Sequence, residues 1–365
     1  MLIPSLDPSE VVWCGPSLSP AQALEKYDCD RVRDSDDLNI ALEECAGSGP
    51  ARTVFAISGQ ITHRDLLSCF AHSQYLILKH AINQERVAKD LYEVCLIAKA
   101  NDVTAKAHQA VLDRCSSDLT EAHLEGTFVD VCISNGCRHQ AYPPIAAGGA
   151  NAATLHYVQN NEPLKGQLNV LLDAGAEYRC YCADVTRTFP ISGTFSPESK
   201  TIYAIVEEMQ ISCLKMLRAG VNWDDVHILA HTIAIKGLLA CGILKGEPKE
   251  IFDNRVSAAF FPHGIGHYLG MDTHDVGGVV DIVDPDLFLR YLRVRGPLPK
   301  DCVVTVEPGV SLILIRHSYR GIYSFLDLLL TPHGPAIPGK SGSGTLYRPD
   351  RPREILGRRG CQDRG

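Results

Sequence analysis

The sequence lacks an excess of positive charge. Its 365 residues contain 35 Lys and Arg against 43 Asp and Glu, so the formal net charge is −8. Proteins that bind nucleic acid or anionic membranes usually present a basic face, and this balance argues against both kinds of partner. Small neutral or peptide-like partners fit the composition better.

Signals for membranes and for export are also missing. No uninterrupted run of about 18 apolar residues is present, although a membrane-spanning helix would need one. The opening stretch, MLIPSLDPSEVVWCG, has no basic segment followed by an apolar one, so it does not read as a secretory signal. We therefore expect a cytoplasmic protein.

Cysteines are frequent, but no Cys-x-x-Cys pair occurs among them. The 14 cysteines are scattered along the chain, and Cys180 and Cys182 alternate as residues of a strand do. The pattern predicts reduced thiols, and it argues against a zinc site built from cysteines.

Length and patterning predict one large domain and a smaller one. Residues 1–82 alternate short apolar runs with helix-like pieces, which predicts a small α/β domain that begins abruptly. The sequence pattern of residues 83–331 predicts a larger domain of mixed helices and strands. Residues 332–365 are rich in Gly, Pro, Ser and Arg with almost no periodicity, so we expect a disordered tail.

Periodicity and capping signals place several elements within the larger domain. Apolar residues at helical spacing predict one long helix over 85–115, and acidic residues near Thr120 suit the start of a second. Ser196 followed by Pro197 predicts the start of a third. Residues 167–178 and 180–192 read as paired strands, and residues 303–315 as another strand pair.

Asp173 and Asp184 are the first candidates for chemistry. On adjacent antiparallel strands joined by a tight turn their carboxylates would lie close together, because strands are about 4.8 Å apart. Two buried carboxylates repel each other, so a metal ion or a shared proton would have to neutralise them. The alternative makes Asp173 a turn residue before Gly175 and Asp184 an exposed strand residue.

The stretch FFPHGIGHYLGMDTH, residues 260–274, holds His263, His267 and His274 among several glycines. Glycines beside a histidine permit a close approach of the backbone, which a core histidine does not require. The pattern therefore favours one metal ligand with neighbours that contact substrate over three structural histidines.

Glu307 lies within the apolar stretch VVTVEPG, where a buried carboxylate would need a partner or a cation. The alternative is a glutamate at a strand end that faces solvent. Two aspartates, one histidine and one glutamate form an oxygen-rich ligand set that suits Mn²⁺ or a similar hard ion, with zinc and cobalt as alternatives.

A second histidine pair has the spacing of helical zinc ligands. His227 and His231 are four residues apart, but the glutamate of a His-Glu-x-x-His motif is missing. We interpret this segment as an amphipathic helix with one or two exposed histidines.

Four motifs together resemble the signature of the pita-bread metallopeptidases, above all the fungal Xaa-Pro aminopeptidase and prolidase group. The resemblance runs from about Ser5 to Gly309, and its motifs are LLDAGAEY, ADVTRTFPISGTFSP, FPHGIGHYLGMDTHDVGG and VVTVEPG. It implies an α/β (α+β) chain with a pita-bread catalytic domain over 83–331. It also implies that residues 1–82 are part of a smaller N-terminal domain, apparently truncated, of the creatinase/aminopeptidase type.

The resemblance implies the following site. Asp173, Asp184, His267 and Glu307 would bind two Mn²⁺ ions per subunit, with Asp184 bridging them. A hydroxide between the ions would attack an Xaa-Pro bond and release the residue before proline.

Further roles follow from the same resemblance. Glu307 would shuttle the proton, His274 would stabilise the oxyanion, and His263 would face the substrate. His156 would line the substrate pocket, and Arg293 is similar to a position that holds a substrate carboxylate in prolidases. The partners would be peptides with proline second, and a homodimer is a further expectation.

One family feature is missing. Members of the family carry a fifth ligand, a glutamate in an Arg-Ile-Glu-Asp strand, and in residues 324–334 of this chain the matching position is Phe325. Three explanations compete. The chain is an active peptidase with Asp327 or another group as substitute, it is an impaired peptide-binding protein, or the gene model is wrong at both ends.

Overall fold

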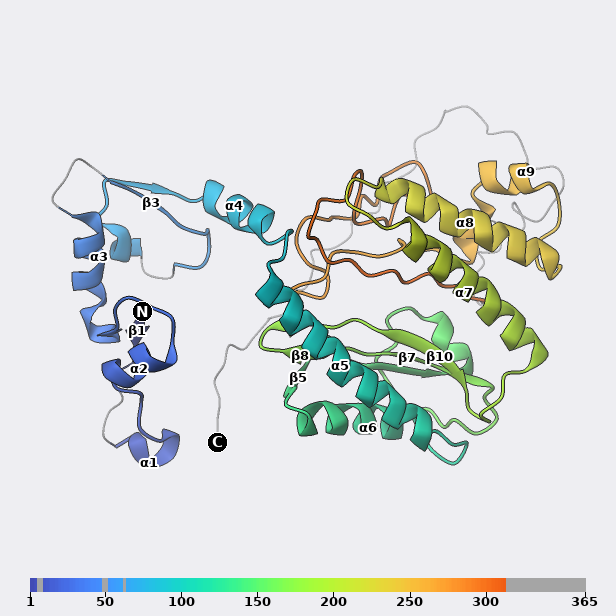
Figure 1. The fold of residues 1–365 in the computed structure, drawn as a ribbon, viewed down its shortest axis with the longest axis horizontal. Helices are drawn as coiled ribbons and strands as arrows, with labels where there is room; N and C mark the ends of the chain where they lie inside the picture. The colour runs from blue at the N-terminus through green and yellow to red at the C-terminus, as the bar shows by residue number, and fades with distance from the viewer. Residues whose placement is uncertain (5–8, 48–51, 62–63, 313–365) are drawn as a thin grey trace, which may run out of the picture. The chain divides into compact units, whose positions relative to one another are not determined.

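The computed structural model describes residues 1–4, 9–47, 52–61 and 64–312 (Figure 1). These residues form two compact units, one over Met1–Ala81 and one from Ile82 onward. The domain limits expected from the sequence stay predictions. No helix in the described ranges is both long and apolar enough to span a bilayer.

The first unit has short elements and few buried side chains. Strand β1 (Leu2–Ile3) runs parallel to β2 (Arg33–Asp34), and β3 (Thr53–Phe55) runs parallel to β4 (His72–Gln74). Its other elements are α1 (Val11–Cys14), α2 (Pro20–Lys26), η1 (Ser35–Asp37), α3 (Leu38–Ala46) and η2 (Arg64–Leu67). Among its described apolar residues only Ala23, Ala46, Ala56 and Leu67 are buried, so this unit has a small core.

The second unit contains the longer helices and two antiparallel sheets. After α4 (Ile77–Glu85), its elements are α5 (Leu91–Arg114), α6 (Glu121–Ser134), β5 (His139–Gln140), β6 (Ile145–Gly148), η3 (Gly149–Ala153), β7 (Asn169–Asp173), β8 (Ala176–Tyr178), β9 (Tyr181–Cys182), β10 (Thr186–Pro190), α7 (Pro197–Met216), α8 (Trp223–Ala240), α9 (Pro248–Asp253) and η4 (Val256–Ala259). One sheet has the order β10-β7-β6 and the other β5-β8-β9.

Helix α5 begins later than periodicity predicted. Asp90 caps it, because its carboxylate accepts the backbone N–H of Glu93 at 2.8 Å while the Glu93 carboxylate accepts that of Asp90. Just before the cap, Ala88 pairs with Cys302 and the Lys89 N–H donates to the carbonyl of Asp301. The prediction of one helix over 85–115 was therefore wrong at its start, since these contacts draw residues 88 and 89 out of helical geometry.

Helices α5 and α6 pack against the β10-β7-β6 sheet and build one of the cores. Val103 and Val111 of α5, Leu124 and Phe128 of α6, and Leu172 of β7 belong to the same buried cluster. The predicted pairing of the strands around residues 173 and 184 is confirmed, because β7 and β10 are antiparallel neighbours. This core holds the end of β7, where Asp173 lies.

The start of α7 confirms the capping prediction. Ser196 is the N-cap and accepts the N–H of Ser199, and Pro197 is the first helical residue. Helices α7 and α8 lie side by side in Figure 1. They share a second buried cluster with residues from the 261–298 region. That region carries the histidines of the candidate site.

Candidate active site

Asp173 and Asp184 come from the end of β7 and from the segment that leads into β10. Asp173 pairs with Thr186, so Asp184 lies two residues before that pair. The expectation of a single tight turn between two strands was wrong in detail, because the β8-β9 hairpin separates the two aspartates. Gly175 permits the close approach, since a Cβ there would lie 1.8 Å from the carbonyl oxygen of Ala183.

Tyr142 joins the two aspartates, and sequence reasoning missed it. Its hydroxyl oxygen lies 2.6 Å from Oδ1 of Asp173 and 2.8 Å from Oδ1 of Asp184. One hydroxyl proton cannot serve both carboxylates at once, so a surplus of negative charge remains. Burial and the charge of Asp184 raise the pKa of Asp173 to about 7, although the Tyr142 hydrogen bond opposes the shift. A cation would relieve this repulsion.

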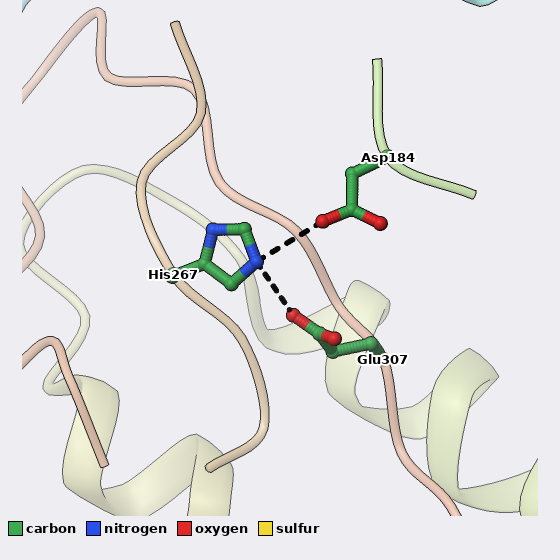
Figure 2. Close-up of side chains that lie close together, drawn as sticks. All are labelled: Asp184, His267 and Glu307. Carbon is green, nitrogen blue, oxygen red and sulfur yellow. Dashed lines mark ion pairs between the residues drawn. The ribbon is translucent and has the colours of Figure 1, made fainter. Parts of the chain in front are cut away.

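His267 presents a bare ring nitrogen to two carboxylates. Its Nδ1 lies 2.9 Å from the carbonyl oxygen of Tyr268, so Nδ1 carries the proton. Its Nε2 lies 3.2 Å from Asp184 Oδ2 and 3.1 Å from Glu307 Oε1, as Figure 2 shows. Nε2 is buried and makes no hydrogen bond with the described residues. A protonated Nδ1 with a free Nε2 is the arrangement of a metal-binding imidazole.

Glu307 is held opposite His267 by Thr305, which sequence reasoning also missed. The Thr305 hydroxyl donates to Glu307 Oε1 at 2.7 Å and accepts the N–H of His267 at 3.0 Å. The backbone N–H of Glu307 donates to the carbonyl of Ile265 at 2.9 Å. Gly266 allows this proximity, because a Cβ there would lie 2.1 Å from the Thr305 carbonyl oxygen.

Residues 303–312 are not a strand pair as expected. These ten residues contain one isolated bridge, Val304 with Tyr268, and no named strand. The remaining residues of the predicted pair, 313–315, lie outside the described residues. Irregular backbone pairing still aligns Glu307 with the His267 segment.

The charges of this cluster depend on one another. Burial alone would lower the pKa of His267, but the carboxylates of Asp184 and Glu307 raise it to about 10. Because Nε2 lacks hydrogen-bond geometry to either oxygen, we attribute the shift to their charge. For Glu307, burial would raise the pKa, and the neighbouring His267 outweighs it and lowers the pKa. Positive charge at the position of Nε2 is thus strongly favoured.

Three of the four expected ligands meet at one point. Ligand atoms of Asp184, His267 and Glu307 all lie within 4.8 Å of one another. Asp173 is connected to this group through Tyr142. The donor set of carboxylate oxygens and one imidazole nitrogen suits a divalent cation. The buried, unpartnered Nε2 independently fits a metal ligand.

The two other histidines of the stretch occupy different surroundings. The ring of His274 lies 4.4 Å from that of His267, edge to face, and its outer side is exposed. Burial of its inner side, with the charges of His267 and Arg293, lowers the pKa of His274 to about 4. His263 donates from Nδ1 to the carbonyl of Gly264 at 2.9 Å, and burial lowers its pKa.

His156 and Arg293 are less constrained. His156 is exposed, and Arg293 is partly buried. Neither forms a hydrogen bond or ion pair with a residue in the described ranges. Arg293 is near enough to His274 for its charge to act there, and His156 acts on His263 in the same way. Their roles at the substrate stay predictions.

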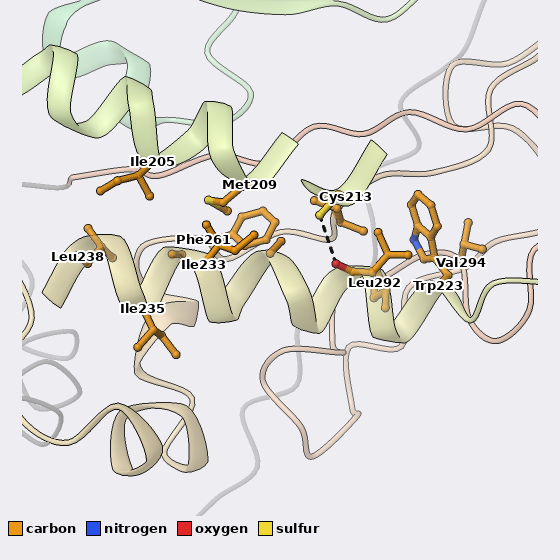
Figure 3. Close-up of a cluster of buried hydrophobic side chains, with 14 of the residues drawn as sticks. Ile205, Met209, Cys213, Trp223, Ile233, Ile235, Leu238, Phe261, Leu292 and Val294 are labelled. Atoms are coloured by element: carbon orange, nitrogen blue, oxygen red, sulfur yellow. Dashed lines mark hydrogen bonds between the residues drawn. The ribbon is translucent and has the colours of Figure 1, made fainter. Parts of the chain in front are cut away.

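The expectation of exposed histidines on α8 was wrong. His227 and His231 are both fully buried. Their helix packs against α7 on one side and against Phe261 and residues around 288–294 elsewhere, so it has no broad polar face there (Figure 3). The two rings bond to each other, to the Phe288 carbonyl and to the Ser257 hydroxyl. They form a structural pair without a carboxylate partner, in which only Nδ1 of His227 has no hydrogen-bond partner among the described residues.

Two other expectations concern the C-terminal part. The stretch 324–334, with Phe325 and Asp327, and the tail from residue 332 lie outside the described residues.

Comparisons with known proteins agree with this geometry. Residues 95–331 match the model of metallopeptidase family M24. The chain is 55% identical over 317 residues to a probable Xaa-Pro aminopeptidase of Talaromyces stipitatus, covering 85% of this chain and 68% of that protein.

Solved structures extend the likeness to the fold. One is a proline aminopeptidase P II from Yersinia pestis, with a TM-score of 0.71 and 30% identity over 84% of this chain and 71% of that one. Another is a zinc-substituted Escherichia coli aminopeptidase P in complex with product, with a TM-score of 0.72 and 29% identity over 84% and 70%. The mixed α/β fold expected from the sequence is confirmed.

Proposed function

Because the chain belongs to metallopeptidase family M24 and has the pita-bread fold of aminopeptidase P, we propose that it hydrolyses Xaa-Pro bonds and releases the residue before proline. The observation that carries the proposal is the meeting of Asp184, His267 and Glu307, with the unpartnered Nε2 between two carboxylates. Relatives named as Xaa-Pro aminopeptidases support the same substrate class. They give no support to an impaired peptide-binding protein.

The proposed metal set is Asp173, Asp184, His267 and Glu307, holding two Mn²⁺ ions. Two divalent ions supply a nucleophilic water at neutral pH and polarise the carbonyl of the scissile bond. The four side chains bring three negative charges to one place, and Asp173 and Asp184 repel each other there. Such a site selects divalent cations by charge, and its carboxylate oxygens suit Mn²⁺.

Glu307 is the proposed proton carrier. Its Oε1 faces both His267 Nε2 and the Thr305 hydroxyl, and its side chain remains about one-third exposed. A carboxylate that is held on one oxygen and open on the other can take a proton from the attacking water and return it to the leaving nitrogen. That nitrogen gains one proton as the C–N bond breaks, as any leaving amide nitrogen does, and it departs as the secondary amine of proline.

His274 and His263 complete the proposed site. His274 is exposed and its ring lies 4.4 Å from that of His267, so it can donate a hydrogen bond to the oxygen on which negative charge develops. His263 faces Gly309 through Nε2, since a Cβ at Gly309 would lie 3.2 Å from that atom. We propose that His263, together with His156 and Arg293, contacts the substrate. A substrate with proline second suits such a site, because the site need not bind an amide N–H.

Peptide hydrolysis with metal analysis tests the proposal. The purified chain, loaded with Mn²⁺, should cleave Ala-Pro-Ala to alanine and Pro-Ala and should leave Ala-Ala-Ala intact. Comparison with the dipeptide Ala-Pro separates aminopeptidase from dipeptidase activity. About two manganese ions per chain should remain after dialysis. A protein with bound metal that cleaves no proline peptide would contradict the proposal.

A further inference from the structure

The turn that carries His274 is held on both sides by one arginine. Nη2 of Arg86 lies 2.6 Å from Oδ2 of Asp272 and 2.6 Å from Oδ1 of Asp275. These two aspartates flank His274 in the sequence, at positions −2 and +1. A single guanidinium nitrogen thus closes the turn around the histidine. Charge-assisted bonds of this length are among the stronger ones in proteins.

Asp275 has a second cationic partner. Nζ of Lys89 lies 2.7 Å from Oδ2 of Asp275, and the side chains of both residues are only 1% exposed. Gly270 leaves room for this carboxylate, because a Cβ there would lie 2.3 Å from Asp275 Oδ2. Removal of one partner from a buried ion pair leaves an uncompensated charge, so this arrangement strongly specifies one position of the turn.

The cations come from a segment that is itself fixed. The backbone of Lys89 donates to the Asp301 carbonyl at 2.8 Å, and Ala88 pairs with Cys302. This pairing lies only a few residues before Glu307 in the chain. Residues 86–89 therefore contact both the turn around His274 and the segment that leads to Glu307.

Only the His274 side chain of the turn faces the candidate metal ligands. The Thr273 hydroxyl donates to the Ala141 carbonyl at 3.1 Å, next to Tyr142. Asp272 and Asp275 bind Arg86, and the His274 ring lies 4.4 Å from His267. The three residues that flank His274, namely Asp272, Thr273 and Asp275, are each bonded to another segment. These bonds leave the His274 ring directed toward the candidate ligands.

We propose that Arg86 and Asp275 are positioning residues that fix His274 beside the proposed reaction centre. The inference rests on the proposed function and adds a part to it. Neither side chain is bonded to a candidate ligand. The backbone N–H of Asp275 donates to the Tyr268 carbonyl, which also accepts from Nδ1 of His267, so metal content has to be measured beside kcat to show that the effect passes through His274. Groups behind a site residue typically change activity by about 10- to 100-fold when they are lost.

A double-mutant cycle tests the inference. Arg86→Met keeps much of the length of the side chain and removes its charge. It should lower kcat for Ala-Pro-Ala by about 10- to 100-fold with little change in KM, because His274 acts on the transition state. In a His274→Ala background the same change should lower kcat by less than about threefold, since the positioned group is gone. Arg86→Lys should restore part of kcat.

Controls separate positioning from general damage. Asp286→Asn breaks a partly buried ion pair with Arg255 on the same domain, away from the candidate ligands, and should leave kcat unchanged. Asp272→Asn loosens the turn without touching the buried Lys89 and Asp275 pair, and Asp272 is 62% exposed, so this variant should fold even if Arg86→Met does not. Its smaller loss of kcat should also vanish without His274.

The outcomes distinguish the two proposals. If Arg86→Met or Asp272→Asn lowers kcat equally in the wild-type and the His274→Ala background, the positioning role is overturned. A folded Arg86→Met variant with full activity would also overturn it. A metal-loaded wild-type protein that does not cleave Ala-Pro-Ala overturns the proposed function instead. Metal content and the thermal unfolding midpoint, measured for each variant, show whether the metal site and the fold are retained.

Discussion

Two groups of histidines come close to the Phe261 ring, and their surroundings differ. The Phe261 centroid is 4.8 Å from the ring of His263, 4.9 Å from that of His231 and 5.4 Å from that of His227. In the 260–274 stretch that carries His263, His267 meets two carboxylates. In the α8 pair, His231 stacks on Phe288 at 3.7 Å and bonds to Ser257 and His227.

The protonation state of each histidine follows from its hydrogen-bond and charge partners. The carbonyl of Phe288, 2.6 Å from Nε2 of His227, can only accept, so that nitrogen carries the proton and the pair is neutral. Burial lowers the pKa of His227 to about 4 and that of His231 to about 2. Carboxylates raise the pKa of His267 to about 10. The chemical use of a buried histidine is therefore decided by carboxylates that other segments supply, and the spacing between histidines does not reveal it.

Removal of one ring from each group should give the largest contrast. His267→Ala should lower hydrolysis of Ala-Pro-Ala by more than the roughly 10- to 100-fold expected for a residue behind a ligand, and should reduce bound manganese. His231→Ala should keep metal and kcat but lower the free energy of unfolding by about 2 kcal/mol or more, because it empties a packed core position. Metal analysis, kinetics and urea unfolding measure the three quantities. Retention of metal by His267→Ala would contradict the ligand assignment.

A second contrast uses two threonine hydroxyls. Thr305→Val removes the donor that holds Glu307 and the acceptor for the His267 N–H. Manganese affinity should fall by about 10- to 100-fold. Thr232→Val on α8 removes only an exposed hydroxyl bonded to the Ile228 carbonyl, and its affinity should match wild type. Titration of the metal-free protein with Mn²⁺ gives both values. Equal affinities for the two variants would show that Thr305 does not support the ligands.

Local sequence signals predicted those parts of the fold that depend on neighbouring residues. Ser196 and Pro197 start a helix because the cap needs only a few adjacent backbone groups. The strands β7 and β10 pair because both are short apolar runs near each other in the chain. The same reasoning put Asp184, His267 and Glu307 forward as one set, and their ligand atoms do lie together.

Signals from distant residues were not visible in the sequence. Tyr142 reaches Asp173 and Asp184 across 31 and 42 residues, and nothing in its own surroundings marks it. His227 and His231 are polar residues in a largely apolar helix, and this pattern predicted that they would be exposed. Residues around 257, 261 and 288 pack against them and bury them. The predicted start of the long helix over 85–115 was wrong for the same reason. Asp301 and Cys302, which are distant in the sequence, form backbone contacts with residues 88 and 89.

The smallest effect expected concerns the pH dependence of stability. In the folded protein His231 and His227 have a pKa below that of an unfolded histidine, about 6.5. Between pH 6.5 and about 4 the unfolded chain therefore binds more protons than the folded one, and stability falls as pH falls. Each such histidine contributes a slope of at most about 1.4 kcal/mol per pH unit in that window. Above pH 6.5 the contribution is complete and constant.

His231→Phe removes one of these groups and keeps a ring against Phe288. Its absolute stability depends on the lost bonds to Ser257 and His227, so the slope is the quantity to compare. Urea unfolding at several pH values from 4 to 8 should show a shallower fall of the unfolding free energy below pH 6.5 than in the wild type, by about 1.4 kcal/mol per pH unit at most. His80→Phe makes the same replacement at an exposed histidine of α4 and is the matched control. Parallel curves for wild type and His231→Phe would mean that the buried pair already takes up a proton in the folded state, and the two histidine groups would then differ less than their contacts indicate.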